Sequence, residues 1–144
     1  MSEGQSTKIT VEAIVHAPVA SVWTYWTEPE HITQWNHASD DWHTPYAEND
    51  LRAGGKFLSR MEAKDGSFGF DFSGVYDEVI LREKIAYTLD DGRKVEIDFA
   101  PQGGDTKIVT VFDAEESNPV DMQQAGWQAI LNNYKKYAEA APGK

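Results

Sequence analysis

The feature that most constrains the fold is a long amphipathic segment near the end of the chain, residues 118–140. Asn118 followed by Pro119 is typical of a helix start, because Asn can cap free N–H groups and Pro suits the first turn. Large apolar side chains recur at helical spacing and define one face. These are Trp127, Ile130, Leu131, Tyr134 and Ala138. One helix cannot bury so wide an aromatic face alone, so we expect the rest of the chain to cover it.

Gly126 lies inside this predicted helix. A glycine in a helix interior costs about 1 kcal/mol relative to alanine. We therefore expect another part of the backbone to approach closely at this position, which is possible only where no side chain is present.

The N-terminal part predicts one strand and two short helices. Residues 6–16 alternate apolar and polar side chains, as in a strand with one buried face. Residues 18–27 place apolar side chains on one helical stripe, and residues 29–35 form a second short helix that begins at Pro29. Because mostly strands follow, this order favours an α+β domain over a parallel βαβ arrangement.

The middle of the chain predicts a series of strands joined by tight turns. We expect strands over residues 41–47, 56–63, 67–79, 85–89, 94–100 and 106–114. Asp65-Gly66 and Asp91-Gly92 are hairpin signals, and Gly54-Gly55 is interpreted as a backbone bend before a strand. Since such turns link successive strands, the sheet should be antiparallel and meandering.

The bulk properties exclude several function classes. The 144 residues suit one domain, which we place at residues 6–140 with flexible termini at 1–5 and 141–144. The formal net charge of −11 makes this acidic protein repel nucleic acids and anionic membranes. The chain has no Cys, no membrane-spanning apolar run and no signal-peptide core, so we expect a cytoplasmic protein that does not insert into membranes.

Several separate motifs resemble one superfamily. VEAIVHAPVASVWTYWTEPEHITQW is similar to the opening of the SRPBCC (START-like) superfamily, which includes birch-pollen-allergen-like proteins. DLRAGGKF, FSGVYDEV, EKIAYTLDDGR and TVFDAEESNPVDMQQAGWQAILNNYKKY resemble its activator of heat-shock-protein-90 ATPase homologue group. The resemblance covers residues 8–137. It implies the helix-grip (START-like) fold: a curved antiparallel sheet of about seven strands around a long C-terminal helix, two short helices after the first strand, and a cavity between sheet and helix.

The aromatic residues are the main candidates for lining that cavity. Large apolar residues usually belong to the core, which is the default interpretation of each one. The functional hypothesis is that a subset forms a ligand pocket. The candidate ligand-binding residues are Trp26, Trp35, Trp42, Phe57, Arg60, Glu62, Phe70, Phe72, Tyr87, Phe99, Trp127, Leu131 and Tyr134.

The charged pair Arg60 and Glu62 leaves two orientations open for the strand over residues 56–63. Its members lie two apart and so share one face. Either Phe57 points into the fold and the charged pair faces water, or the charged pair and Asp71 form a buried network that orients a polar ligand group. The common parity of the aromatic residues in the next strand favours the first orientation.

The polar segment that contains His37, Asp40, Asp41 and His43 is the other candidate for chemistry. Its spacing matches no familiar ligand motif, so we interpret it as a solvated loop and predict no metal. A general base at His37 or His43 is a weaker hypothesis. The sequence contains neither a Gly-x-Ser-x-Gly motif nor a phosphate-binding glycine loop, and we predict no cofactor.

Together with these residues, the resemblance implies three candidate functions. The first, which we favour, is a non-enzymatic binding protein for an apolar, aromatic or lipid-like small molecule, as the superfamily includes lipid and hormone carriers. The second is a polyketide cyclase- or aromatase-like enzyme that uses the same cavity, with Arg60, Glu62 and His43 as the residues to test. The third is a chaperone ATPase activator. We place it last because that co-chaperone's domain is part of a longer chain, whereas we expect this domain to stand alone.

Overall fold

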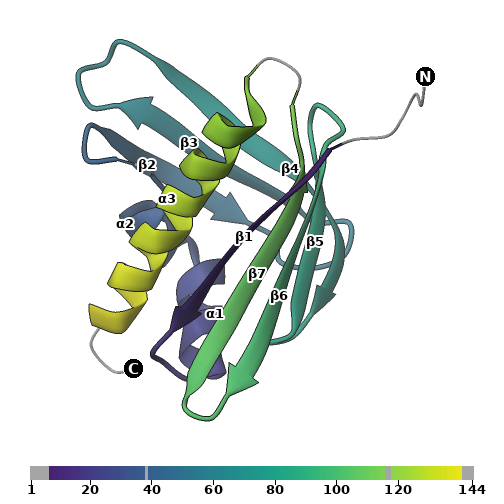
Figure 1. Cartoon of the computed structure of the whole chain (residues 1–144). Helices are drawn as coiled ribbons and strands as arrows, with labels where there is room; N and C mark the ends of the chain where they lie inside the picture. Colours follow the sequence, from purple (N-terminus) through teal and green to yellow (C-terminus); the bar gives the residue numbers. More distant parts are fainter. Residues whose placement is uncertain (1–6, 38, 116–117, 141–144) are drawn as a thin grey trace.

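The structure, a computed structural model, describes residues 7–37, 39–115 and 118–140. The termini predicted to be flexible, residues 1–5 and 141–144, lie outside these ranges. The described part has an α+β fold in which one curled antiparallel sheet of seven strands partly surrounds a long C-terminal helix (Figure 1). This is the helix-grip arrangement that the sequence predicts.

The elements follow the predicted order. They are β1 (Lys8–Val15), α1 (Val19–Thr27), α2 (Pro29–Trp35), β2 (Trp42–Asn49), β3 (Lys56–Ala63), β4 (Gly69–Ile80), β5 (Lys84–Leu89), β6 (Lys94–Gln102), β7 (Asp105–Asp113) and α3 (Val120–Ala140). The bounds of α2 and β3 are those predicted, and the other bounds differ by two residues at most. Differences of that size are ordinary at element ends.

The sheet order is β1-β7-β6-β5-β4-β3-β2, with every neighbouring pair antiparallel. Strands β2 to β7 form the predicted meander, and β1 forms one edge of the sheet by pairing along β7, with Lys8 opposite Asp113. The bend at Gly54-Gly55 is also present, since Gly54 N–H donates to the Tyr76 carbonyl at 2.8 Å and φ of Gly54 is +85°.

Helix α3 packs against β1, α1 and α2 on the concave side of the sheet (Figure 1). Its predicted apolar face points inward: Leu131, Tyr134 and Ala138 are buried, and Trp127 and Ile130 are half-buried. None of the helices in the described residues combines the length and hydrophobicity needed to span a membrane.

The start of α3 differs from the prediction. The carbonyl of Pro119 accepts the N–H groups of Met122 and Gln123, both at 3.1 Å, so Asn118 is not the capping residue. The Asn118 amide instead donates to the Glu115 carboxylate at 3.0 Å. The Gln123 side chain holds this arrangement by donating to the Asn118 carbonyl at 2.8 Å and accepting the Glu115 N–H at 2.8 Å.

The close backbone approach predicted at Gly126 is also wrong. A Cβ atom at this position would meet no atom within 4 Å. The glycine therefore leaves open space beside the helix. The free-energy cost of placing glycine in a helix interior is not offset by closer packing at this position.

Candidate functional site

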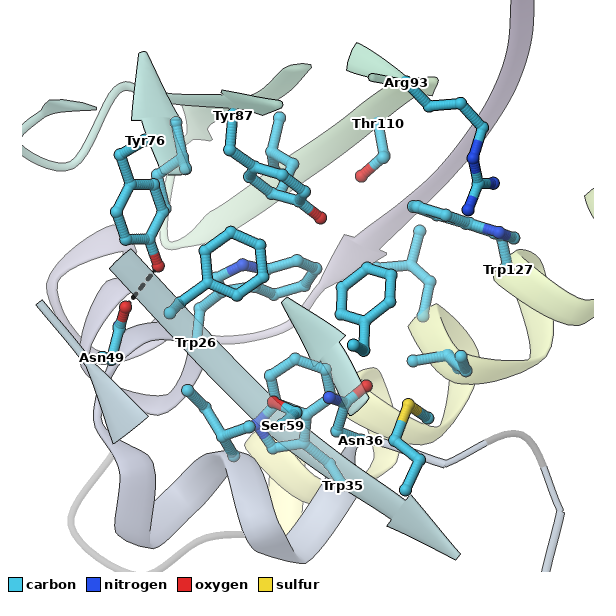
Figure 2. Close-up of a pocket in the computed structure, with 18 of the residues that line it drawn as sticks. Trp26, Trp35, Asn36, Asn49, Ser59, Tyr76, Tyr87, Arg93, Thr110 and Trp127 are labelled. Carbon is cyan, nitrogen blue, oxygen red and sulfur yellow. Dashed lines mark hydrogen bonds between the residues drawn. The ribbon is translucent and has the colours of Figure 1, made fainter. Parts of the chain in front are cut away.

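A cavity of about 280 Å³ lies between the concave face of the sheet and α3. Eight of its 22 lining residues are aromatic, and polar groups lie at several points among the apolar side chains (Figure 2). Phe70 and Arg93 are lining residues that remain partly accessible to solvent, with 39% of Phe70 and 24% of the Arg93 side chain exposed. Glu48, another lining residue, is exposed as well.

Eight of the thirteen candidate residues line this cavity. They are Trp26, Trp35, Phe57, Phe70, Phe72, Tyr87, Trp127 and Leu131. The rings of Trp26 and Trp35 lie 4.9 Å apart, and those of Phe72 and Trp127 lie 6.2 Å apart. The second pair joins β4 to α3, so rings from opposite sides of the fold meet around one space.

Two of the remaining candidates, Tyr134 and Phe99, belong to the packed core. Tyr134 is completely buried, and its hydroxyl donates to the Val22 carbonyl at 2.6 Å, which ties α3 to α1. Burial raises the pKa of Tyr134. Phe99 fills the space between Trp23 and Trp26, with ring centroids at 5.3 and 5.7 Å. Both residues therefore support the cavity wall from behind.

Trp42 also lies outside the cavity lining. Its ring contacts Phe68 at 5.9 Å and Phe70 at 6.0 Å, at the end of the β2–β3–β4 part of the sheet. The position follows from its pairing with Ala63, the last residue of β3, beyond the part of that strand that lines the cavity. Of these three aromatic residues, only Phe70 lines the cavity.

Arg60 and Glu62 are on the opposite face of β3 from the cavity. Phe57, together with Ser59 and Met61, points inward. This is the orientation favoured by the alternating aromatic residues of the next strand. Arg60 contacts Glu62 at 2.9 Å and Asp71 at 3.3 Å. The hydrogen bonds to these carboxylates raise the pKa of Arg60. Such an exposed network is ordinary surface electrostatics and orients no group inside the cavity.

Fourteen lining residues were not among the candidates. They are Val11, Ile32, Asn36, Glu48, Asn49, Ser59, Met61, Tyr76, Ile85, Arg93, Ile97, Thr110, Glu115 and Ile130. Strand alternation could have added Ser59 and Met61 once Phe57 was placed inward. Arg93 gives no such signal, because it directly follows a turn and its direction depends on that turn.

Three hydroxyl groups line the cavity without a hydrogen-bond partner among the described residues. They belong to Ser59 of β3, Tyr87 of β5 and Thr110 of β7, and all three residues are buried. Figure 2 shows the hydroxyls of Tyr87 and Thr110 directed into the cavity. Burial raises the pKa of Tyr87, so its phenol stays protonated and can donate. These groups can hydrogen-bond to a molecule in the cavity.

The hydroxyl of Tyr76, by contrast, is fully engaged within the protein. It donates to the Asn49 side chain, whose amide donates in turn to the Thr27 carbonyl at 2.6 Å (Figure 2). Burial raises the pKa of Tyr76, so its phenol stays protonated and can donate this bond. This end of the cavity is therefore fixed by structural bonds between β4, β2 and α1.

Arg93 occupies the other end of the cavity, near Trp127 (Figure 2). Its Nε donates to the Asp91 carboxylate at 2.8 Å, and its backbone N–H donates to the same group at 3.1 Å. Partial burial alone would raise the pKa of Asp91, but these hydrogen bonds and the nearby positive charge lower it. Asp91 therefore stays ionised and holds the guanidinium in place.

A group with metal-ligand spacing is found away from this cavity. Ligand atoms of Glu28, Glu30 and His31 lie within 4.8 Å of one another. Both carboxylates are exposed, and His31 Nδ1 is hydrogen-bonded to the Tyr137 hydroxyl at 2.6 Å. Within the described residues, His37 and its acidic neighbours form no group of this kind.

Comparisons with known proteins agree with this architecture. In solved structures, the AHSA1-like protein from Aeromonas hydrophila is 46% identical over 93% of both chains, with a TM-score of 0.88. A protein from Cytophaga hutchinsonii is 57% identical over 92% of both chains, with a TM-score of 0.80. A protein from Nitrosomonas europaea, 20% identical over 90% of this chain and 92% of its own, shares the fold with a TM-score of 0.76. No curated protein matches the chain.

A family model gives the assignment. Residues 16–139 match the model described as activator of Hsp90 ATPase homolog 1-like protein. The match spans most of the chain, and it includes the two short helices, the meander and nearly all of α3. The chain therefore belongs to the activator of Hsp90 ATPase homolog 1-like family.

Proposed function

We propose that this protein binds an apolar or aromatic small molecule, a class that includes lipid-like compounds, in the cavity between the sheet and α3. The observation that carries the proposal is the cavity of about 280 Å³ with its aromatic walls. Protein interiors are normally close-packed, so a void of this size is unusual in a small domain. Its volume of about 280 Å³ lies just below the range of about 300–1,000 Å³ that is usual for ligand pockets, which suits a small ligand.

The arrangement of the walls supports the same proposal. Trp26 and Trp35 on one side and Trp127 on another offer ring faces and edges to a bound aromatic group (Figure 2). Phe72 lies against the Trp127 ring and adds a further aromatic surface. The Tyr87 hydroxyl, which has no hydrogen-bond partner among the described residues, adds a donor inside this apolar space. A few polar groups within a mostly apolar lining are typical of small-molecule sites.

An NMR titration of the 15N-labelled protein with 2-acetonaphthone, a neutral aromatic ketone, tests the proposal. We expect saturable chemical-shift changes concentrated at lining residues such as Ser59, Tyr87 and Trp127. A parallel screen would cover fatty acids and larger aromatic compounds. If no compound of either class shifts these resonances, the proposal is wrong.

A cavity-filling variant makes the test specific. Ser59→Leu places three additional carbon atoms in the cavity, so we expect it to weaken 2-acetonaphthone binding at least tenfold without unfolding the protein. Ser21→Leu is the matched control, because Ser21 is half-buried on α1 and does not line the cavity. Equal affinities in the two variants would show that the probe binds elsewhere.

The two other functions considered above give different results in separate assays. A cyclase-like enzyme would convert a polyketide substrate, and its turnover would depend on lining groups, since Arg60, Glu62 and His43 do not line the cavity. An activator of a chaperone ATPase, the activity in the family's description, would raise ATP hydrolysis by an Hsp90-type chaperone. Either activity in the purified protein would replace the binding function proposed here.

A further inference from the structure

We propose that the natural ligand carries a carboxylate and that Arg93 binds it where the cavity reaches the surface; this inference rests on the binding function proposed above. Arg93 is the one cationic side chain among the described lining residues. The ligand would accordingly be an aromatic or fatty carboxylic acid, with its apolar part inside the cavity and its carboxylate at Arg93.

The turn before β6 fixes the Arg93 side chain. Gly92 adopts φ +93°, and the Leu89 N–H donates to the Arg93 carbonyl at 2.8 Å, which closes the β5–β6 hairpin. The Asp91 carboxylate then accepts both the backbone N–H and the Nε–H of Arg93. A guanidinium held in this way loses little conformational freedom when it binds a ligand.

The donors that remain on Arg93 suit a carboxylate. A guanidinium has five N–H groups in a planar fork, and Asp91 takes the one on Nε. The Nη groups of Arg93 have no acceptor in the part of the chain that the structure describes. Two such N–H groups can bind both oxygens of one carboxylate, an arrangement stronger than a neutral hydrogen bond.

The neighbouring groups favour an apolar molecule with one charged end. Trp127 lies at the same end of the cavity as Arg93, and Thr110 directs its hydroxyl into the space between Arg93 and Tyr87 (Figure 2). An oxygen at Arg93 would therefore have an aromatic ring beside it and further hydroxyl donors deeper in. Water screens a charge pair less at such a partly buried position than on an open surface.

Two carboxylates, Glu48 and Glu115, also line the cavity. Each already accepts a hydrogen bond, Glu48 from the Tyr46 hydroxyl and Glu115 from the Asn118 amide at 3.0 Å. Their charges and that of Asp91 weaken the attraction for an anion, but no described carboxylate accepts an Nη–H of Arg93. Arg93 therefore contributes most through directed hydrogen bonds, which a neutral analogue of the ligand cannot use as well.

A matched pair of probes tests this inference. 2-Naphthoate and 2-acetonaphthone share the same ring system and carbonyl position, but only the first is charged. We expect the wild-type protein to bind 2-naphthoate more tightly in NMR titrations. Arg93→Gln should weaken 2-naphthoate binding roughly tenfold, as expected for loss of a charge-assisted hydrogen bond, and change 2-acetonaphthone binding less than about twofold.

Arg52→Gln is the matched control. Arg52 donates from Nε to the carboxylate of Asp50, also two residues earlier, at 2.9 Å. Its side chain is 70% exposed and does not line the cavity, so we expect both probes to bind this variant as they bind the wild type. The control separates the position of Arg93 from the general loss of one positive charge.

Asp91→Asn provides a change of opposite sign. The Asn side chain can still accept the Nε–H of Arg93, but the competing negative charge is gone. We expect 2-naphthoate binding to become roughly two- to threefold tighter, within the modest range of partly exposed charge pairs, and 2-acetonaphthone binding to stay unchanged.

The outcomes distinguish the two proposals. If both probes bind but Arg93→Gln weakens them equally or not at all, the carboxylate assignment is wrong and the binding function stands. If neither probe binds the wild-type protein and the wider screen is also negative, both proposals fail. A 15N NMR spectrum of each variant, compared with that of the wild type, verifies that the fold is retained.

Discussion

The indole of Trp127 stacks on the ring of Phe112, with the ring centroids 3.8 Å apart and the planes 12° from parallel. Phe112 is completely buried on β7, whereas Trp127 lines the cavity from α3. The edge-on contact with Phe72 extends the same ring toward β4. Trp127 therefore joins the fixed core to the candidate site and belongs to both.

Replacing Trp127 should consequently affect stability and binding together. Trp127→Ala removes the stacked ring and enlarges the cavity, so we expect a loss of about 3 kcal/mol in unfolding free energy by urea denaturation. Binding of 2-acetonaphthone should weaken as well. Met122→Ala, on an exposed residue of the same helix, should cost less than about 0.5 kcal/mol. Equal costs for the two variants would contradict this role of Trp127.

Two threonines of β7 have different roles: the hydroxyl of one is hydrogen-bonded within the fold, and that of the other faces the cavity. Thr106 and Thr110 are both buried on the same face of the strand. The Thr106 hydroxyl donates to the Ala17 carbonyl at 2.9 Å, whereas the Thr110 hydroxyl faces the cavity without a partner in the described residues. We therefore expect Thr106→Val to cost about 1–2 kcal/mol in unfolding free energy and Thr110→Val to cost almost nothing.

The ligand assays should give the reverse order for the same pair. Thr110→Val keeps the shape of the side chain but removes a donor from the cavity, so binding of 2-naphthoate should weaken. Thr106→Val should leave it unchanged. If Thr110→Val destabilises the protein as much as Thr106→Val, its hydroxyl has a structural role and is not available to a ligand.

The fold could be predicted from local signals because nearly every strand connection is short. The hairpins at Gly66 and Gly92 have positive φ angles, as their turn sequences indicate, and these connections set the meander. The strand β3 has its predicted bounds and orientation because alternation and its neighbour's aromatic parity agree. The start of α3 could not be predicted in the same way, since it depends on the side chain of Gln123 folding back to Glu115.

The site could be predicted only in part. Periodicity shows which side chains point inward, but it does not show which of them pack in the core and which line the cavity. Tyr134 and Trp127 share one face of α3, yet Tyr134 bonds to α1 and leaves no surface in the cavity. Trp42 lies on the inward-facing side of β2, but it pairs with Ala63 at the end of β3 and does not reach the cavity. Arg93 lines the cavity through a turn geometry that the sequence pattern does not specify.

Asn133 and His37 form a contact that should make stability depend on pH. The Asn133 amide donates to the Trp35 carbonyl at 2.8 Å and lies 3.2 Å from His37 Nε2, so this nitrogen accepts and the imidazole is neutral. Its Nδ1 is buried without a partner among the described residues. Burial, followed by the charge of Lys64, lowers the pKa of His37 below its ordinary value of 6.5.

The sign of the effect follows from that direction. In the unfolded chain His37 binds a proton at higher pH than in the folded protein, so the unfolded state gains protons first as the pH falls below about 6.5. Its contribution to stability is therefore present above that pH and is lost below it. We expect His37→Gln, which keeps an acceptor for Asn133, to flatten the fall in unfolding free energy between about pH 7 and pH 5. Equal slopes for variant and wild type would contradict the assignment.

Gly126 gives the clearest stability test, because the space around it is open. A Cβ added there meets no atom within 4 Å, so Gly126→Ala should raise the unfolding free energy by about 0.5–1 kcal/mol through helix propensity and a less flexible unfolded chain. Gly55→Ala is the opposite case, since its Cβ would lie 2.0 Å from the Asp50 carbonyl oxygen, and it should destabilise the protein. Urea denaturation measures both changes. Destabilisation by Gly126→Ala would mean that α3 needs its glycine for a reason other than packing. If Gly126→Ala is instead stabilised but binds 2-acetonaphthone with a different affinity, the glycine influences the cavity through the adjacent Trp127.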